Sequence, residues 1–195
     1  MDNLIIIGVT GLPSAGKGLF CDIARKYGFK QIIMGDVIRN ECHKRGLPVN
    51  RESSNKVMID LRREGGENAV AIITLDWIRQ AIISGHNLIL IDGIRSLSEV
   101  KTFRNEYQDF NVISIHASQK TRLKRAMQRR RRDDAFSKQA FIKRDNIELN
   151  IGIGDVIAKS DILISSESVI GETRDAFREV ISYLIKQKKI EIEIL

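Results

Sequence analysis

A glycine-rich stretch near the amino terminus has the residue types and spacing needed to hold phosphate groups. Residues 11–18 satisfy the Walker A pattern G-x-x-x-x-G-K. The glycines let the backbone curl so that successive N–H groups point at phosphate oxygens, and Lys17 adds a positive charge for the β and γ phosphates. The sequence therefore predicts a site for a purine nucleoside triphosphate, formed by Gly11, Leu12, Pro13, Ser14, Ala15, Gly16, Lys17 and Gly18.

This loop lacks a hydroxyl group where such loops usually carry one. Gly18 and Leu19 follow Lys17, whereas a Ser or Thr at this point usually helps to hold Mg²⁺. Because Mg²⁺ prefers phosphate, carboxylate and water oxygens, we expect Asp92, near the end of an apolar run, to hold it through water. The alternative for Asp92 is a cap on a turn or a helix.

Two arginines that follow expected strands could hold a second phosphate. Arg39 lies one helical turn after Asp36, and Arg95 comes shortly after the strand that precedes Asp92. Parallel strands bind ligands at their carboxyl ends, and a planar guanidinium group suits a phosphate. We expect Arg39 and Arg95 to bind the phosphate of an acceptor, with Asp36 orienting that acceptor. The alternatives are a surface position for Arg39, a structural ion pair for Arg95 and a helix cap for Asp36.

The positive charge of the chain is concentrated in one segment. The formal net charge is +7, but residues 118–144 hold eleven Lys or Arg and two Asp, which gives +9, while the remainder holds 21 basic and 23 acidic residues, which gives −2. If residues 119–132 are helical, Arg122, Arg125, Arg129 and Arg132 share one face of the helix. This distribution favours a segment that closes over polyphosphate or lies against RNA.

Alternating elements must position these residues. Apolar runs predict strands at residues 4–9, 31–34, 87–91, 111–116 and 161–165. Amphipathic patterns predict helices at residues 17–26, 37–44, 53–63, 68–83, 97–107, 137–149 and 172–186, with the basic segment between the fourth strand and residue 137. Charge alternates with Ile in residues 189–195, which predicts an edge strand. Strands separated by helices indicate an α/β fold with a five-stranded parallel sheet covered on both faces.

Three motifs together resemble adenylate kinases and related nucleoside monophosphate kinases. The loop is similar to their G-x-P-G-x-G-K-G, with Ser14 in place of a glycine, residues 35–39 resemble G-D-x-x-R, and residues 92–95 resemble a shortened D-G-F-P-R. The resemblance extends over most of the chain to archaeal adenylate-kinase-related proteins, which share G-L-P-x-x-G-K-G, M-G-D-V-I-R and a late R-D. Met34 departs from the adenylate kinase pattern, which usually has a small hydroxyl residue there.

The resemblance implies a three-layer P-loop NTPase fold in a single domain, residues 1–195, with an acceptor-binding insertion at 36–85 and a basic lid at 118–146. It implies that ATP and Mg²⁺ bind at the loop, with Lys17 and Asp92 taking part in catalysis, and that the γ-phosphoryl group passes to a small, nucleotide-like phosphorylated acceptor. In the family, arginines of the lid act on the transferring group. By resemblance, Arg125 and Arg129 would take this role here, and Arg144 would reach back to the substrate.

A run of four arginines, Arg129–Arg132, supports a competing function. Such a run is typical of surfaces that contact an RNA backbone, which would make the chain an RNA-directed kinase or an RNA- or ribosome-associated ATPase switch. A solvated basic helix is the third interpretation. The two functions share the nucleotide-binding loop and differ in the partner.

The lengths of the apolar runs and the amino-terminal sequence indicate where in the cell the chain is expected. The longest apolar runs are far shorter than the roughly 20 residues that span a bilayer, and the amino terminus lacks a signal-peptide pattern. We therefore expect a cytoplasmic protein without a membrane partner. The two cysteines, Cys21 and Cys42, are expected to be reduced and without a catalytic role.

Overall fold

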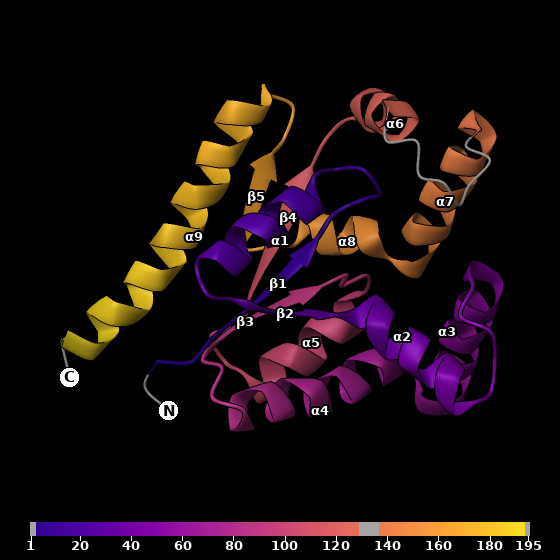
Figure 1. Ribbon diagram of the computed structural model, residues 1–195, viewed down its shortest axis with the longest axis horizontal. Coiled ribbons are helices and arrows are strands. Elements are labelled where there is room, and N and C mark those ends of the chain that lie inside the picture. Colours follow the sequence, from indigo (N-terminus) through magenta and orange to yellow (C-terminus); the bar gives the residue numbers. More distant parts are fainter. Residues whose placement is uncertain (1–2, 129–136, 194–195) are drawn as a thin grey trace.

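The computed structural model describes residues 3–128 and 137–193. One sheet of five parallel strands has the order β2-β3-β1-β4-β5 (Figure 1). The strands are β1 (Ile5–Thr10), β2 (Lys30–Ile33), β3 (Leu88–Asp92), β4 (Asn111–His116) and β5 (Ile162–Ser165). The predicted α/β fold is confirmed. Because β1 lies between β3 and β4, the loop that follows β1 starts at the centre of the sheet edge.

Helices cover both faces of this sheet (Figure 1). Those of the described residues are α1 (Lys17–Lys26), α2 (Met34–Lys44), α3 (Arg51–Gly65), α4 (Ala69–Ile83), α5 (Leu97–Glu106), α6 (Gln119–Gln128), α7 (Lys138–Ile151), α8 (Ile153–Ala158) and α9 (Ile170–Glu193). Helices α1 and α9 pack together on one face, and α4 and α5 cover the other. None of the helices among the described residues is both long and apolar enough to cross a membrane.

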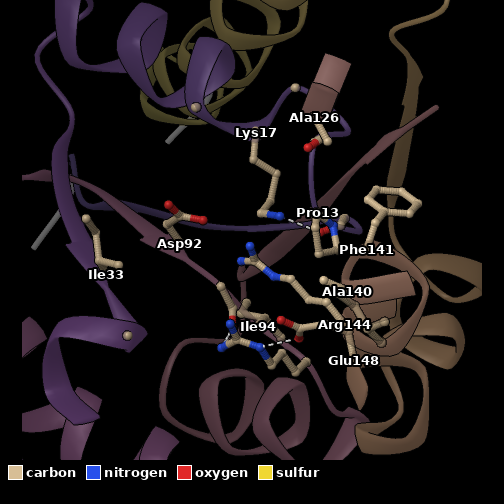
Figure 2. Close-up of a pocket in the computed structure, with 18 of the residues that line it drawn as sticks. Pro13, Lys17, Ile33, Asp92, Ile94, Ala126, Ala140, Phe141, Arg144 and Glu148 are labelled. Carbon is tan, nitrogen blue, oxygen red and sulfur yellow. Dashed lines mark hydrogen bonds and ion pairs between the residues drawn. The ribbon is translucent and has the colours of Figure 1, made fainter. Parts of the chain in front are cut away.

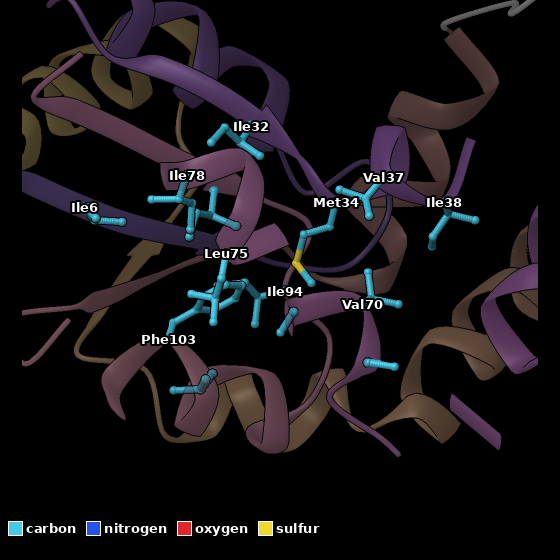
Figure 3. Close-up of a cluster of buried hydrophobic side chains, with 14 of the residues drawn as sticks. Ile6, Ile32, Met34, Val37, Ile38, Val70, Leu75, Ile78, Ile94 and Phe103 are labelled. Atoms are coloured by element: carbon cyan, nitrogen blue, oxygen red, sulfur yellow. The ribbon is translucent and has the colours of Figure 1, made fainter. Parts of the chain in front are cut away.

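Alternating strand residues supply the two cores. Ile6, Ile89 and Ile91 face the cluster formed with α2, α3, α4 and α5, part of which is drawn in Figure 3. Ile7 and Leu90 face the opposite cluster, formed with α1 and α9. Successive side chains of a strand point to opposite faces, so a sheet buried on both faces reads as a continuous apolar run. This is why the strands were visible in the sequence.

The register of the strands brings the candidate site residues to one edge of the sheet, at the carboxyl ends of the strands. Asp92 is paired with Val9 of β1 and with Ile33 of β2. The loop after β1, the start of α2 after β2, and the turn after β3 therefore begin side by side. Residues that follow three different strands can contribute to one site.

Two sequence expectations are corrected, and one helix was not predicted. The prediction of an edge strand at residues 189–195 is wrong, because α9 continues to Glu193. Adding residues to an existing helix is favoured, since the costly step of forming its first turn has already been made. Met34 does not end β2 but begins α2, and its side chain is buried in the core (Figure 3). Helix α8 was not expected; it begins after Gly152, whose φ of 109° ends α7. The last four residues of the basic segment 119–132, Arg129–Arg132, lie outside the described residues.

Candidate functional site

The loop between β1 and α1 has the backbone of a phosphate cradle. Gly11 and Gly16 have φ values of 140° and 112°, in the region that favours glycine. A Cβ atom on Gly11 would lie 2.3 Å from the carbonyl oxygen of Ile115, so a larger residue does not fit there. Ser14 has a φ of 65°, in the same region, which a residue with a side chain rarely adopts. Three of the six residues from 11 to 16 thus take a conformation that turns the backbone around a central space.

Lys17 begins α1 and faces the loop. Its Nζ atom donates a hydrogen bond to the carbonyl oxygen of Gly11. Burial lowers the pKa of Lys17, and the negative charge of Asp92 opposes this effect. Asp92 accepts a hydrogen bond of 3.1 Å from Nε2 of Gln31. A Cβ atom at Gly18 would meet nothing within 4 Å, so the space that a Ser or Thr would fill is open.

A cavity of about 490 Å³ lies at the carboxyl ends of β1, β2 and β3 (Figure 2). In Figure 2 the side chains of Lys17, Asp92 and Arg144 point into the same space. The sequence predicts one site for these residues, and the structure brings them together. The charged residues that line the cavity are Lys17, Arg39, Asp92, Arg95, Arg144 and Glu148.

Arg39 and Asp36 lie one turn apart on α2. Nε of Arg39 donates to Oδ1 of Asp36 at 2.8 Å. The side chain of Arg39 is 46% exposed, yet it lines the cavity, so it is not a plain surface residue. The cap alternative for Asp36 is wrong, because α2 starts at Met34 and its N-cap residue is Ile33. Asp36 instead holds the guanidinium group of Arg39.

Arg95 forms an ion pair that the sequence offered as an alternative. Its Nε atom donates to Oε2 of Glu148 at 2.5 Å, and its NH1 donates to the carbonyl oxygen of Gly93 at 3.1 Å. Burial lowers the pKa of Arg95, but the charge and hydrogen bond of Glu148, with the charges of Glu99 and Asp92, outweigh it and raise the pKa. Arg95 is therefore both a cavity residue and one half of a pair.

Glu148 is a charged cavity residue that was not predicted from the sequence. Burial raises the pKa of Glu148, but the charge and hydrogen bond of Arg95 and the charges of Lys17 and Arg144 outweigh it and lower the pKa. The carboxylate thus stays ionised among three cations. The sequence did hold a signal for Glu148: it follows Arg144 by four residues, so the two side chains share one face of the helix.

Arg122, which the sequence places on one arginine stripe with Arg125, Arg129 and Arg132, is not among the described residues that line the cavity. Its guanidinium group makes two bonds to Asp145 of α7, at 2.8 and 2.6 Å, and each side chain is 3% exposed. It also donates to the carbonyl oxygens of Ala117 at 3.1 Å and Pro13 at 3.2 Å. Helical spacing defines a face but not what that face meets, and here a buried carboxylate meets Arg122. The pair joins α6, α7 and the phosphate-binding loop.

Arg125 lies against the loop beside the end of β5. Its NH1 donates to Oγ of Ser166 at 3.0 Å and to the carbonyl oxygen of Ala15 at 3.5 Å. Oγ of Ser166 donates to the same carbonyl oxygen at 2.6 Å. Within the described part of the chain, Arg125 is not among the residues that line the cavity. Arg129 and the remainder of the run 129–132 lie outside the described residues.

Both cysteines are buried and free. Burial raises the pKa of the Cys21 thiol, and the charge of Asp92 adds to this effect. A protonated, buried thiol is a poor nucleophile, which agrees with the expected lack of a catalytic role. No group of three or more His, Cys, Asp or Glu among the described residues is placed to hold a metal ion.

Glu167 holds the first turn of α6 and gives a pH-dependent prediction. It accepts hydrogen bonds from Oγ1 of Thr121 at 2.6 Å and from the backbone N–H of Ser118. These bonds lower the pKa of Glu167 from 4.5 to about 2. A carboxyl group with a lowered folded-state pKa stabilises the fold above its unfolded-state pKa and loses that contribution as the pH falls toward the folded value.

We therefore expect Glu167→Gln to lower the free energy of unfolding at pH 6 by a small amount, since the group is exposed. The difference from the wild type should shrink at pH 3, which lies between the two pKa values of 4.5 and about 2. Urea unfolding at both pH values measures it. A larger difference at pH 3 than at pH 6 would contradict the assignment.

Comparison with known proteins gives relatives for the sequence and for the fold. A family model described as an AAA domain matches residues 10–143. The UPF0200 protein of Methanothermobacter thermautotrophicus is 40% identical over 185 residues, covering 95% of this chain and 93% of the relative. That of Thermococcus sibiricus is 38% identical over 187 residues, covering 95% and 98%.

Two solved structures share the fold. TT1252 from Thermus thermophilus has a TM-score of 0.66 at 15% identity, and the similarity covers 93% of this chain and 98% of the other. Dephospho-CoA kinase from Campylobacter jejuni has a TM-score of 0.58 at 17% identity, with the same coverage of 93% and 98%.

Proposed function

Since the chain belongs to the UPF0200 family and is a P-loop protein like the nucleoside monophosphate kinases, we propose that it transfers the γ-phosphoryl group of ATP to a small, nucleotide-like phosphorylated acceptor. One observation carries the proposal. The loop lysine, Lys17, lines the same cavity as Arg39 and Arg95, the two arginines that follow the neighbouring strands β2 and β3. A site with cations for two separate phosphates suits a reaction between two phosphate-bearing molecules.

The loop fits a triphosphate. Gly11 leaves no room for a side chain, and the positive φ values at residues 11, 14 and 16 turn the backbone around the space beside Lys17. In this proposal Lys17 and the backbone N–H groups hold the phosphates, and Asp92 holds Mg²⁺ through water. Bound Mg²⁺ would offset negative charge on the phosphates. The open space at Gly18 leaves room for water there.

The acceptor would bind on the side of Arg39 and Arg95. Asp36 fixes the guanidinium group of Arg39, while Arg95 is held by Glu148 until a phosphate competes for it. Arg144 lies on the same helix as Glu148, α7, and lines the cavity. We propose that the segment 118–146 closes on the site as a lid and that 36–85 is the acceptor-binding insertion, which would exclude water from the transfer.

A panel of acceptors tests the proposal. ADP release from ATP and Mg²⁺ is measured with nucleoside monophosphates, dephospho-coenzyme A, other small phosphorylated compounds and structured RNA. We expect one small acceptor to stimulate release strongly. Stimulation by RNA alone would instead favour the RNA-associated ATPase, with Arg129–Arg132 as its contact.

Arg39→Ala is the decisive variant in this panel. We expect the KM for the acceptor to rise roughly 10- to 100-fold, because hydrogen bonds to a charged group are lost. Arg178→Ala is the matched control, since Arg178 forms the same i,i+3 pair with Asp175 on α9 and does not line the cavity. Equal kinetics in the two variants would contradict an acceptor site at Arg39.

A further inference from the structure

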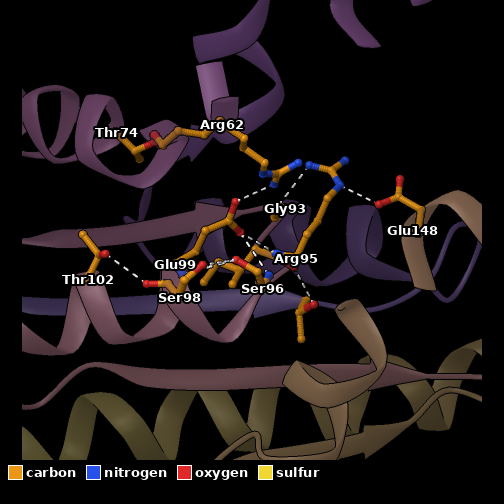
Figure 4. Close-up of polar contacts among 12 residues, drawn as sticks. Arg62, Thr74, Gly93, Arg95, Ser96, Ser98, Glu99, Thr102 and Glu148 are labelled. Atoms are coloured by element: carbon orange, nitrogen blue, oxygen red, sulfur yellow. Dashed lines mark hydrogen bonds and ion pairs between the residues drawn. The ribbon is translucent and has the colours of Figure 1, made fainter. Parts of the chain in front are cut away.

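Glu99 is a buried carboxylate at the start of α5 that accepts hydrogen bonds from three residues (Figure 4). Its side chain is 1% exposed. Oε2 accepts hydrogen bonds from the backbone N–H groups of Arg95 at 2.7 Å and Ser96 at 3.2 Å. Oε1 accepts from NH2 of Arg62 at 2.9 Å. Figure 4 shows Glu99 between Arg62 on one side and the Arg95 turn on the other.

The start of the helix explains only part of this arrangement. Ser96 and Glu99 form a capping box, in which each side chain bonds the backbone of the other. A capping box needs no partner from another helix. Arg62 comes from α3, 37 residues away in sequence, and its side chain is 18% exposed. Burying a carboxylate without a positive partner is costly, and Arg62 is the cation that bonds to Oε1 of Glu99.

The contact therefore links two parts of the predicted acceptor site. Helix α3 packs against α2, which carries Arg39. Glu99 in turn fixes the backbone of Arg95. Through Arg62 and Glu99, the helix pair that carries one cavity arginine is tied to the turn that carries the other.

Arg63 shows that this link is specific to one position of α3. It is the next residue on the helix, its side chain is 73% exposed, and it pairs with Asp60 of its own helix at 3.1 Å. Arg62 and Arg63 have the same chemistry and helix propensity, but only the first reaches Glu99 among the ion pairs of the described residues.

We propose that Arg62 and Glu99 are positioning residues that set the spacing between Arg39 and Arg95, and thereby the affinity for the phosphate of the acceptor. The proposal rests on the proposed function of the cavity. Two guanidinium groups can grip one phosphate only while their separation is held within a fraction of an ångström. The pair acts through the two arginines and does not touch the acceptor.

Kinetics of paired variants test this role. With the acceptor identified in the panel, Arg62→Met should lower kcat/KM for the acceptor about 10- to 100-fold. The KM for ATP should stay unchanged, since the hydrogen bonds and ion pairs of Arg62 and Glu99 within the described residues do not reach the phosphate-binding loop. Arg62→Lys, which keeps the charge, should recover part of the loss, and Arg63→Met should behave as the wild type. Equal losses for ATP and acceptor would indicate general damage to the fold and would overturn the proposal.

Hydrogen–deuterium exchange tests the same link without any acceptor. In the full-length chain, Arg62→Met should speed exchange of the Arg95 and Ser96 amides at least about tenfold, because their acceptor Glu99 loses its partner. Amides of β1 and β3 should keep their rates, and Arg63→Met should change neither set. Unchanged exchange at Arg95 and Ser96 would overturn the proposal. If no acceptor stimulates the wild type, the proposed kinase function fails while exchange still decides whether Arg62 fixes the Arg95 turn.

Discussion

Replacement of Lys17 by alanine should reduce ATP-dependent ADP release by about 100-fold or more, with a matching loss of ATP affinity. Lys17 is the cation of the phosphate-binding loop, and its Nζ atom already contacts the loop at the carbonyl oxygen of Gly11. Burial lowers the pKa of Lys17, which means that burying the charged ammonium group costs free energy. The negative charge of bound phosphates would offset that cost. ADP release and titration with a fluorescent ATP analogue measure the two losses.

Stability separates this effect from misfolding. Because burial lowers the pKa of Lys17, its charged form does not stabilise the fold at neutral pH, and we expect Lys17→Ala to unfold at a temperature no lower than the wild type. Lys26→Ala is the control, since Lys26 lies in the exposed last turn of the same helix. If ATP affinity survived Lys17→Ala unchanged, the kinase and the RNA-associated ATPase would lose their common basis.

The phosphate-binding loop was predictable because its chemistry lies in consecutive residues. Its glycines and lysine, the buried strand before them and helix Lys17–Lys26 are all local features, and that helix has the predicted bounds. Arg39 and Arg95 were also predictable, although they are distant in sequence. Each follows a parallel strand, and the parallel order itself places the carboxyl ends of neighbouring strands together.

The partners in the ion pairs around the site could not be predicted in the same way. Arg95 and Glu148 are 53 residues apart, and Arg122 and Asp145 are 23 apart. Helical spacing shows which residues share a face, but which two faces meet depends on the packing of the whole chain. The basic segment was thus read as a single arginine stripe, whereas the structure buries Arg122.

Loss of the Arg122 side chain should destabilise the fold strongly. We expect Arg122→Met to lower the free energy of unfolding by about 3–5 kcal/mol, measured by urea unfolding at neutral pH. The substitution keeps an apolar stem of similar length but leaves the carboxylate of Asp145 buried without its cation. Both side chains are only 3% exposed, so water cannot replace the lost bonds without movement of α6 or α7.

Two further variants identify the cause of this loss. Arg122→Met combined with Asp145→Leu should recover most of the stability, because replacing both members of a buried ion pair by apolar residues is often neutral or stabilising. Arg178→Met, which breaks the exposed pair with Asp175, should cost no more than about 1 kcal/mol. A loss in Arg122→Met no greater than in Arg178→Met would show that the pair does not carry the stability assigned to it.

The double variant also isolates what Arg122 contributes to the loop. Arg122 donates to the carbonyl oxygen of Pro13 at 3.2 Å, and Pro13 lines the cavity. A folded double variant lacks this bond, so the loop loses a connection to α6 and α7 while Lys17 and its glycines stay in place. We expect ATP affinity to fall several-fold, by about the 0.5–1.5 kcal/mol of one hydrogen bond, and far less than in Lys17→Ala. A loss as large as that of Lys17→Ala would instead mean that the Arg122–Asp145 pair is required to hold the whole cradle in shape.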